Sequence, residues 1–577
     1  MSASRLVVDR ARWARRLRVA GPSALAGLLM ALSIPPWGFW ILAFPAAALL
    51  WWRLDGLPVG LRLLAGYVAG LGLYVPSLWW AVPFNVYGGI IMMLLLGIGP
   101  AVACALAPPG RGRTFALAGA MVLLEMLRDR WPFGGMPLGG IALGQVAGPL
   151  GATARIGGQF LVLGLVWVLG GGLGALALAA ARAWRARRAA HREAAGWQAL
   201  ADHAATVGSA AERGGVGGTI PEGVVRGRPA RVGGMVAAGL AAVASVVAVA
   251  ALGTVAPDGG PAVGTVQAAA VQGGGVRGLR KAQVDPTVVY VRQLEASSLL
   301  PPPTGAGPPR LVLWPEDVVA LDQPLVGSPQ AEALGNLAVS LGASLLVGVT
   351  EPAPGRHFLN EVVAFGPDGR IVAHYEKVHR VPFGEYVPAR SFFEHLADLS
   401  GVPLDAVPGH GDGVLRTPAA TVGAMVSYEV FFPDRARIPV RAGAELLVVP
   451  TNTSSYATTQ VPTQEIAASR LRAIEEGRDL VQAAPAGYSA VIDNHGTVHA
   501  ISVLGRRQVL VRSVALRRGL TVYGHVGDLL AFVASIAALA GGWLASMSQR
   551  DERRDSARAE RAATAERRAE RERVRQS

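Results

Sequence analysis

Apolar residues gather in eight segments of the chain that are long enough, or nearly so, to cross a bilayer as helices. A span needs about 20 residues of helix. The eight segments are Ser23–Ile34, Trp37–Trp52, Leu63–Val82, Gly88–Ala107, Thr114–Leu127, Ile156–Ala181, Gly234–Val255 and Val526–Ser546. This pattern predicts a multi-span helical membrane domain. Because no small-residue cleavage site follows the first segment, we expect it to be retained as a span.

The pattern changes between Pro261 and Arg518, where short β-rich runs alternate with helical stretches. Strands are predicted at Thr265–Val271, Leu311–Trp314, Ser344–Val349, Glu361–Phe365, Thr421–Ser427 and Leu446–Val449, and helices at Ala331–Ser340 and Thr463–Glu476. Alternation of this kind indicates an α/β domain with its own core.

The placement of charge gives the chain an orientation. Hydrophobic residues make up 51% of the chain and charged residues 16%, with a net charge of +14. Basic residues cluster at Arg5–Arg18, at Arg182–Arg192 and from Arg550 onward, beside apolar segments. Lys and Arg concentrate on the cytoplasmic flanks of spans, so we expect both termini inside and the α/β domain outside. Basic charge placed in this way also argues against nucleic-acid binding.

These signals divide the chain into six parts. We expect a membrane domain with six spans at 1–181, a basic cytoplasmic linker at 182–233, a seventh span at 234–255, the extracytoplasmic domain at 261–518, an eighth span at 526–546 and a charged cytoplasmic tail at 547–577. The Arg/Ala/Gly-rich linker is predicted to be partly disordered, and the tail to be either a solvated helix or disordered.

The sequence predicts neither a metal nor a cofactor. Cys104 is the single cysteine, which excludes a disulfide within the chain and a four-cysteine zinc site. His374, His379 and His410 lack metal-ligand spacing. Gly273–Gly278 matches G-x-G-x-x-G, but no ribose-binding carboxylate follows it in a βαβ context. Glu125 and Arg128, at helical spacing near a membrane boundary, either pair with each other or face a lipid-accessible cavity.

Three short segments of the α/β domain carry groups that could do chemistry. Glu316 follows the apolar run Leu311–Trp314. The stretch from Tyr375 to Pro388 reads Y-E-K-V-H-R-V-P-F-G-E-Y-V-P and contains Lys377 and Glu385. The third segment, Val426–Pro433, begins V-S-Y-E and contains Ser427, Tyr428 and Glu429.

Together these segments resemble the nitrilase superfamily and, within it, the apolipoprotein N-acyltransferases. That family has a Glu after a strand, a Lys in K-x-H-x-V-P-F-G-E-Y and a Cys in C-Y-E. Further matches are Gln464-Glu465 leading into Arg470–Glu475, Thr521–Gly524, and Pro35–Gly38 in the membrane half. The resemblance covers nearly the whole chain except the linker and the tail.

The resemblance implies an α-β-β-α sandwich beside a multi-span membrane domain in the bacterial plasma membrane. It implies transfer of an acyl chain from a phospholipid, through an acyl-enzyme, to the N-terminal amino group of diacylglyceryl-cysteine in a lipoprotein. The implied partners are a phospholipid donor, a diacylated lipoprotein acceptor and the membrane.

The resemblance also assigns residue roles. Glu316 would be the base, Lys377 the cation that stabilises the oxyanion, and Ser427 would stand at the nucleophile position. The Tyr428 N–H would help form the oxyanion hole, while Glu385 and Glu429 would position the other groups.

The chain departs from the family pattern at three places. Ser427 replaces the family cysteine, Gln272–Val276 replaces a Q-G-N-I-P-like segment, and Asn452–Tyr456 replaces an N-D-x-W-F-like segment. A serine hydroxyl is far less acidic than a thiol, so Glu316 suits it poorly unless burial raises the pKa of Glu316. Two other functions therefore stay open: a catalytically impaired accessory or lipoprotein-binding homologue, and a membrane-bound amidase with a small substrate. The membrane half argues against the amidase.

Overall fold

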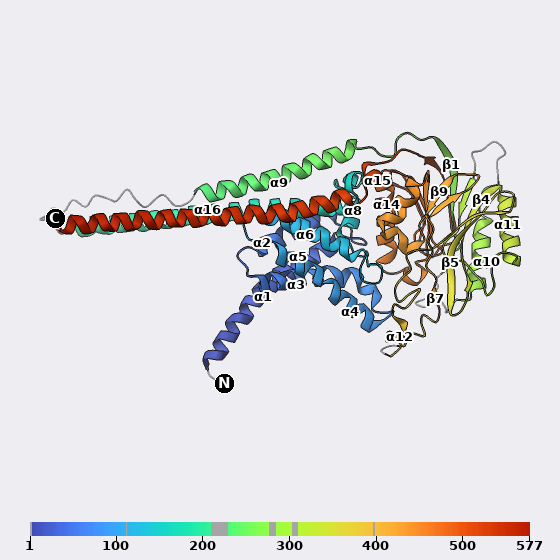
Figure 1. Cartoon of the computed structure of the whole chain (residues 1–577), viewed down its shortest axis with the longest axis horizontal. Helices are drawn as coiled ribbons and strands as arrows, with labels where there is room; N and C mark the ends of the chain where they lie inside the picture. Colours follow the sequence, from blue (N-terminus) through green and yellow to red (C-terminus); the bar gives the residue numbers. More distant parts are fainter. Residues whose placement is uncertain are drawn as a thin grey trace.

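The computed structural model describes residues 3–110, 112–208, 229–275, 284–302, 310–395 and 398–576. It contains a helical region and an α/β domain that meet along one face (Figure 1). The helical region consists of α1 (Ala3–Leu32), α2 (Ala43–Arg53), α3 (Val59–Leu78), α4 (Val86–Leu96), α5 (Ile98–Leu106), α6 (Arg113–Arg128), α7 (Ile141–Gln145), α8 (Ala154–Gly208), α9 (Pro229–Val255) and α16 (Leu529–Gln576).

Among the described residues, five stretches of helix are long and apolar enough to cross a membrane. They are Val59–Ala81, Val86–Leu106, Gly151–Ala199, Gly233–Val255 and Leu529–Glu566, and a shorter apolar helix covers Trp40–Arg53. These helices support a multi-span membrane protein, as the apolar pattern predicts. The division into eight spans and the orientation of the chain stay predictions.

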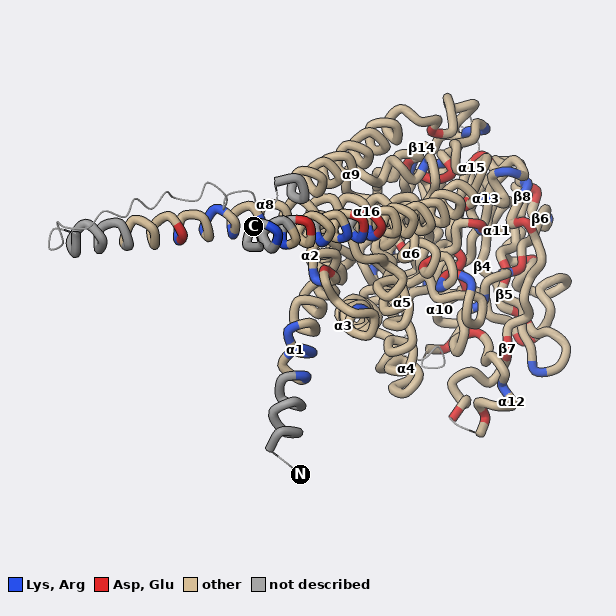
Figure 2. The backbone as a smooth tube through the Cα atoms, turned by 60° about the vertical axis from the view of Figure 1, so that its left-hand side comes forward, with Lys and Arg blue, Asp and Glu red and all other residues tan. Residues whose placement is uncertain are grey.

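The helices that contain the basic segments project away from the α/β domain. In Figure 2 blue residues lie along the projecting parts of α1, α8 and α16, and the helices between these parts and the α/β domain are mostly tan. The first part of the segment expected to be a partly disordered linker is helical, as far as Gly208. Arg, Ala and Glu favour helix even without tertiary packing, and the side chains from His191 to Ala199 are exposed. The rest of the linker, 209–228, lies outside the described residues.

The charged tail is the continuation of α16, which runs without a break from an apolar beginning to Gln576. Of the two states expected for the tail, the structure has the solvated helix: the described side chains from Arg550 onward are exposed.

The α/β domain is built on two sheets. The first has the order β14-β1-β2-β4-β5-β6, with β3 paired to β4 and β7 paired to β5. Its strands are β1 (Gly264–Gln272), β2 (Arg310–Leu313), β3 (Val319–Ala320), β4 (Ala343–Ala353), β5 (His357–Phe365), β6 (Ile371–Glu376), β7 (Asp405–Ala406) and β14 (Gln508–Leu516). The second sheet has the order β13-β12-β11-β10-β9-β8. Its strands are β8 (Val414–Arg416), β9 (Thr421–Ala424), β10 (Leu446–Pro450), β11 (Leu480–Ala483), β12 (Ala490–Ile492) and β13 (Val498–Ile501).

Helices cover both outer faces of the two sheets. Buried residues of facing strands, such as Leu313 of the first sheet and Val422 of the second, form one core between the sheets. A second core lies between the first sheet and the helices α10 (Pro286–Ser297) and α11 (Pro329–Leu341). On the other face lie α13 (Pro433–Arg441) and α14 (Val461–Glu476), and short helices α12 (Arg390–Phe393) and α15 (Val522–Val526) complete the domain. The predicted α-β-β-α sandwich is confirmed.

Helix α14 joins the α/β domain to the membrane helices. Its buried residues belong to a hydrophobic cluster that continues into the membrane helices. Gln464, fully buried, accepts a hydrogen bond from Gly139 N at 3.1 Å and donates one to Ser77 O at 3.2 Å. Three turns later on the same helix, Glu475 accepts from Gln159 N at 2.7 Å. Because these polar groups are buried, their pairing fixes how the α/β domain sits on the membrane helices.

Candidate active site

The three segments singled out in the sequence meet around Lys377. Its ammonium Nζ lies 2.8 Å from Glu316 Oε1 and 2.7 Å from Glu385 Oε1, and the side chain is 1% exposed. The amide of Asn360 on β5 donates to the same two oxygens, at 2.9 and 3.0 Å. Two carboxylates are thus bridged by one ammonium and one amide in a buried site.

The two carboxylates differ in which oxygens remain available. In Glu385, Oε1 takes the bonds from Lys377 and Asn360, and Oε2 accepts from Val381 N at 2.8 Å. In Glu316, both of these bonds go to Oε1, and Oε2 takes neither. The pattern suits Glu385 to hold its neighbours in place and Glu316 to accept a proton at Oε2.

Glu316 is held at the end of β2 by close backbone packing. Trp314 N donates to Leu346 O at 2.8 Å, and the Trp314 indole donates to Ser297 Oγ at 3.0 Å. Gly348 on the neighbouring strand β4 has no side chain at the point where a Cβ would lie 2.5 Å from Glu316 Cα. A larger residue at Gly348 would therefore push the Glu316 backbone out of the site.

Burial and charge set the protonation of this cluster. Burial raises the pKa of Glu316, the Glu385 charge raises it further, and Lys377 opposes both. Burial by itself would lower the pKa of Lys377, but attraction to Glu316 and Glu385 outweighs burial and raises it. Lys377 therefore stays an ammonium, and Glu316 is a stronger base than an exposed glutamate.

Ser427 occupies a sharp bend between β9 and α13. The strand predicted to reach Ser427 ends at Ala424, and Ser427 begins the 3₁₀ helix η5 (Ser427–Phe431). Its φ of 52° is in the left-handed region, which is unfavourable for a residue other than glycine. Such backbone strain is concentrated at functional sites, where the surrounding structure enforces it. Tyr428 lies in the first turn of η5, where a backbone N–H has no acceptor within its own helix.

Glu429 ties the Ser427 bend to the Lys377 segment. Its fully buried carboxylate accepts from Val426 N at 2.8 Å, Val378 N at 2.7 Å, His379 N at 3.0 Å and Tyr375 Oη at 2.9 Å. Val426 precedes Ser427 and Val378 follows Lys377, so the two segments lie on either side of one carboxylate. All six residues named from the sequence therefore belong to one region of the structure.

Two tyrosines connect this region with the loop after α6. Tyr386 Oη donates to Phe133 O and Tyr428 Oη donates to Gly135 O, both at 3.0 Å. The same loop is anchored by Arg128, which donates to Leu138 O at 2.8 Å and to Glu125 Oε2 at 2.9 Å. Of the two alternatives for Glu125 and Arg128, the structure has the ion pair. The region of the six candidate residues thus contacts the loop after α6.

Sequence reasoning missed Asn360 and the aromatic wall beside the cluster. Tyr456, at the end of η6 (Ser454–Tyr456), packs against Trp80 and Phe84 from the loop after α3, with ring centroids 5.2 and 4.5 Å apart. Burial raises the pKa of Tyr456 to about 12, and the nearby Glu385 carboxylate adds to the effect. Asn360 belongs to no recognisable sequence motif. Its role depends on Glu316 and Glu385, which folding brings next to β5.

The two segments in which the chain departs from the family pattern behave differently. Gln272 is fully buried and donates to Val503 O and Arg506 O at 2.8 and 2.9 Å. It therefore supports the turn at 503–506. Residues 276–278 of the glycine-rich motif lie outside the described residues. In the other segment, Asn452 donates to Asp317 Oδ2 at 3.5 Å and Tyr456 faces the cluster.

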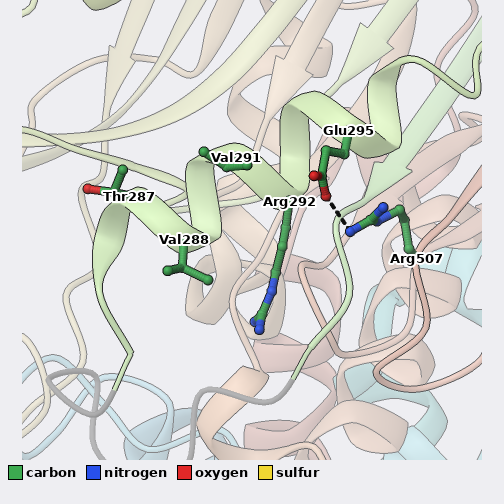
Figure 3. Close-up of a pocket in the computed structure, with 6 residues that line it drawn as sticks. All are labelled: Thr287, Val288, Val291, Arg292, Glu295 and Arg507. Carbon is green, nitrogen blue, oxygen red and sulfur yellow. Dashed lines mark hydrogen bonds and ion pairs between the residues drawn. The ribbon is translucent and has the colours of Figure 1, made fainter.

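Other features of the described residues lie apart from this cluster. A pocket of about 330 Å³ on the surface of α10 is lined by Thr287, Val288, Val291, Arg292, Glu295 and Arg507. In Figure 3 Glu295 pairs with Arg507 across this pocket, and no residue of the Lys377 cluster borders it. Within the described ranges, no group of three or more His, Cys, Asp or Glu side chains could hold a metal ion.

Comparison with known proteins identifies both halves of the chain. Residues 26–173 match the family model of the apolipoprotein N-acyltransferase N-terminal domain, and residues 268–519 match that of carbon-nitrogen hydrolases. The apolipoprotein N-acyltransferase of Mycolicibacterium smegmatis is 30% identical over 545 residues, which cover 89% of this chain and 83% of that protein. The chain belongs to the apolipoprotein N-acyltransferase family.

Further relatives agree with this assignment. The apolipoprotein N-acyltransferase of Rhizobium rhizogenes is 26% identical over 82% of this chain and 85% of its own length. That of Geobacter metallireducens is 32% identical, but the alignment spans 41% of this chain and 46% of the relative. An apolipoprotein N-acyltransferase is an acyltransferase of the carbon-nitrogen hydrolase superfamily, in which a membrane domain accompanies the hydrolase fold. The membrane and lipoprotein context expected from the sequence follows from this membership.

Proposed function

We propose that this apolipoprotein N-acyltransferase uses Ser427 as its nucleophile, Glu316 as its general base and Lys377 as its oxyanion cation. Its acyl donor would be a membrane phospholipid, and its acceptor the α-amino group of diacylglyceryl-cysteine at the N-terminus of a lipoprotein. The observation that supports these roles most directly is the difference between the two carboxylates around Lys377. Glu385 has both oxygens engaged, whereas Glu316 keeps Oε2 for a proton.

In the first half-reaction, Ser427 Oγ attacks the ester carbonyl carbon of the phospholipid and gives its proton to Glu316. Lys377 and the Tyr428 N–H stabilise the negative oxygen of the tetrahedral intermediate. The bond from the carbonyl carbon to the glycerol oxygen then breaks. The departing lysophospholipid takes the proton from Glu316, and the acyl chain remains on Ser427 as an oxygen ester.

In the second half-reaction, the free amino group of the lipoprotein cysteine attacks the same carbonyl carbon. Glu316 accepts the proton that the amine loses. The bond to Ser427 Oγ breaks, Oγ regains the proton, and the acyl chain is held as an amide. The aromatic wall of Trp80, Phe84 and Tyr456, which comes from both domains, suits a site that receives lipid from the bilayer.

A carboxylate base is a weak partner for a serine hydroxyl, and the surroundings of Glu316 lessen this mismatch. Burial and the neighbouring Glu385 charge both raise the pKa of Glu316. The Ser427 backbone has a φ in the strained left-handed region, as is common for residues at functional sites. Both features favour a working serine site, and the accessory-protein alternative gains no specific support from the geometry.

Acyl transfer from a labelled phospholipid to a diacylated lipopeptide, measured with purified full-length protein, tests the proposal. Ser427→Ala and Lys377→Ala should abolish transfer, and Ser427→Ala should also remove the acyl label that wild type retains as an oxygen ester. Ser340→Ala, an exposed serine on α11, is the matched control and should behave as wild type. Wild-type turnover by Ser427→Ala would remove Ser427 from the mechanism, and folded but inactive wild type would favour an accessory role.

A further inference from the structure

A second cavity of the α/β domain lies next to the proposed catalytic residues. It has a volume of about 350 Å³ and is lined by His357, Arg380, Tyr386, Asp405, Ala406, Val407 and Pro408. Arg380 is three residues after Lys377, and Tyr386 directly follows Glu385. The floor of the cavity is fixed to the catalytic cluster, because Ala406 N donates to Glu385 O at 2.7 Å.

The same cavity is close to the membrane helices. Tyr386, which forms one wall, donates from its hydroxyl to Phe133 O of the loop after α6. One wall of the cavity therefore also contacts a loop of the membrane domain. Phospholipid headgroups flank the hydrocarbon core that membrane helices cross, so a site beside these helices suits such a headgroup.

The cavity carries a cation whose charge no neighbouring carboxylate cancels. The Arg380 guanidinium stacks on the Tyr386 ring at 4.0 Å and donates one hydrogen bond, at 2.7 Å, to Ala406 O. A guanidinium has five N–H donors, so most of them remain available. Within the described part of the chain, Arg380 forms no ion pair. Asp405, the one acidic residue of the lining, is paired with Arg390 at 2.5 Å and accepts from Val387 N.

We propose that this cavity binds the phosphodiester of the acyl donor, with Arg380 as the residue that contacts it. Arginine presents paired donors that match the oxygens of a phosphate. In a phospholipid only the glycerol backbone separates the ester carbonyl from the phosphate. A carbonyl held at Ser427 and Lys377 therefore carries its phosphate to a neighbouring site. Arg380 would thus favour phospholipids over neutral acyl glycerides.

This inference rests on the proposed function, and its test uses donors with and without a phosphate. KM and kcat are measured for phosphatidylglycerol and for diacylglycerol as donors, with the same lipopeptide acceptor, in full-length wild type, Arg380→Gln and Arg380→Lys. Arg370→Gln, at an exposed turn of the same domain, is the control. Arg380→Gln should raise KM for phosphatidylglycerol on the order of tenfold, with kcat and the acceptor KM little changed. Arg380→Lys should recover part of the loss, and diacylglycerol kinetics should be the same in all variants.

Three results would overturn the assignment: an unchanged KM for phosphatidylglycerol, an equal loss with diacylglycerol, or a change confined to the acceptor KM. Binding of a fluorescent short-chain phosphatidylglycerol to Ser427→Ala, with and without Arg380→Gln, separates this inference from the catalytic proposal. That measurement needs no turnover. Weaker binding in the double variant supports the phosphate site even if Ser427 proves not to be the nucleophile, and equal binding refutes it.

Discussion

Replacing Glu429 by alanine should damage both the stability and the activity of the protein, because this carboxylate holds the Lys377 and Ser427 segments together. Alanine would leave the N–H groups of Val378, His379 and Val426 buried without an acceptor. Each orphaned buried donor costs about 1–3 kcal/mol, so the three together cost about 3–9 kcal/mol. Folded domains have a total stability of about 5–15 kcal/mol, which makes this loss a large fraction of the whole.

Glu429→Gln separates the charge of the side chain from its shape. A glutamine keeps one acceptor oxygen, but its NH₂ group would face N–H donors that it cannot accept from. We therefore expect an intermediate loss of stability, with Ser427 and Lys377 displaced and acyl transfer reduced by at least a factor of about 100, as for a misplaced catalytic group.

The assay combines thermal unfolding of the full-length protein in detergent with acyl transfer to the lipopeptide. Glu332→Ala, at the beginning of α11 and outside the site, provides the control. We expect wild type to have the highest melting temperature, Glu429→Gln an intermediate one and Glu429→Ala the lowest. If Glu429→Ala melts like wild type and transfers acyl chains at the wild-type rate, the argument that this carboxylate organises the site is wrong.

The remaining predictions concern the nucleophile, the base and the orientation of the chain. Ser427→Cys should raise acyl transfer on the order of tenfold, because a thiol is more acidic than a hydroxyl and a thiolate leaves the acyl-enzyme more easily. A folded but inactive Ser427→Cys variant would mean that the rest of the pocket has diverged. Glu385→Gln should shift the acid limb of the pH–rate profile to lower pH. The Glu385 charge raises the pKa of Glu316, so without that charge Glu316 ionises at lower pH. A shift to higher pH would contradict this electrostatic role. Reporter fusions after Asp258 and after Arg550 should report outside and inside respectively, and an inside signal after Asp258 would reverse the placement of the α/β domain.

The two-part architecture and the candidate site residues could be predicted from the amino-acid pattern. Apolar segments of bilayer length predict membrane helices because each backbone polar group must be satisfied within its own helix. The period of the pattern likewise predicts strands such as Thr265–Val271, which the structure has as β1. Glu316, Lys377 and Ser427 could be found because their neighbours form specific local motifs.

The relation of those residues in space depends on the fold. The motifs around the two glutamates do not indicate which carboxylate oxygens accept from Lys377, Asn360 and Val381, because folding places those donors. The strand predicted to end at Ser427 stops earlier because Val426 N donates to the Glu429 side chain and not to a neighbouring strand. Strand propensity does not indicate when a side chain competes for a backbone donor. Asn360 and the cation at Arg380 take their significance from groups distant in sequence, so no local pattern could reveal them.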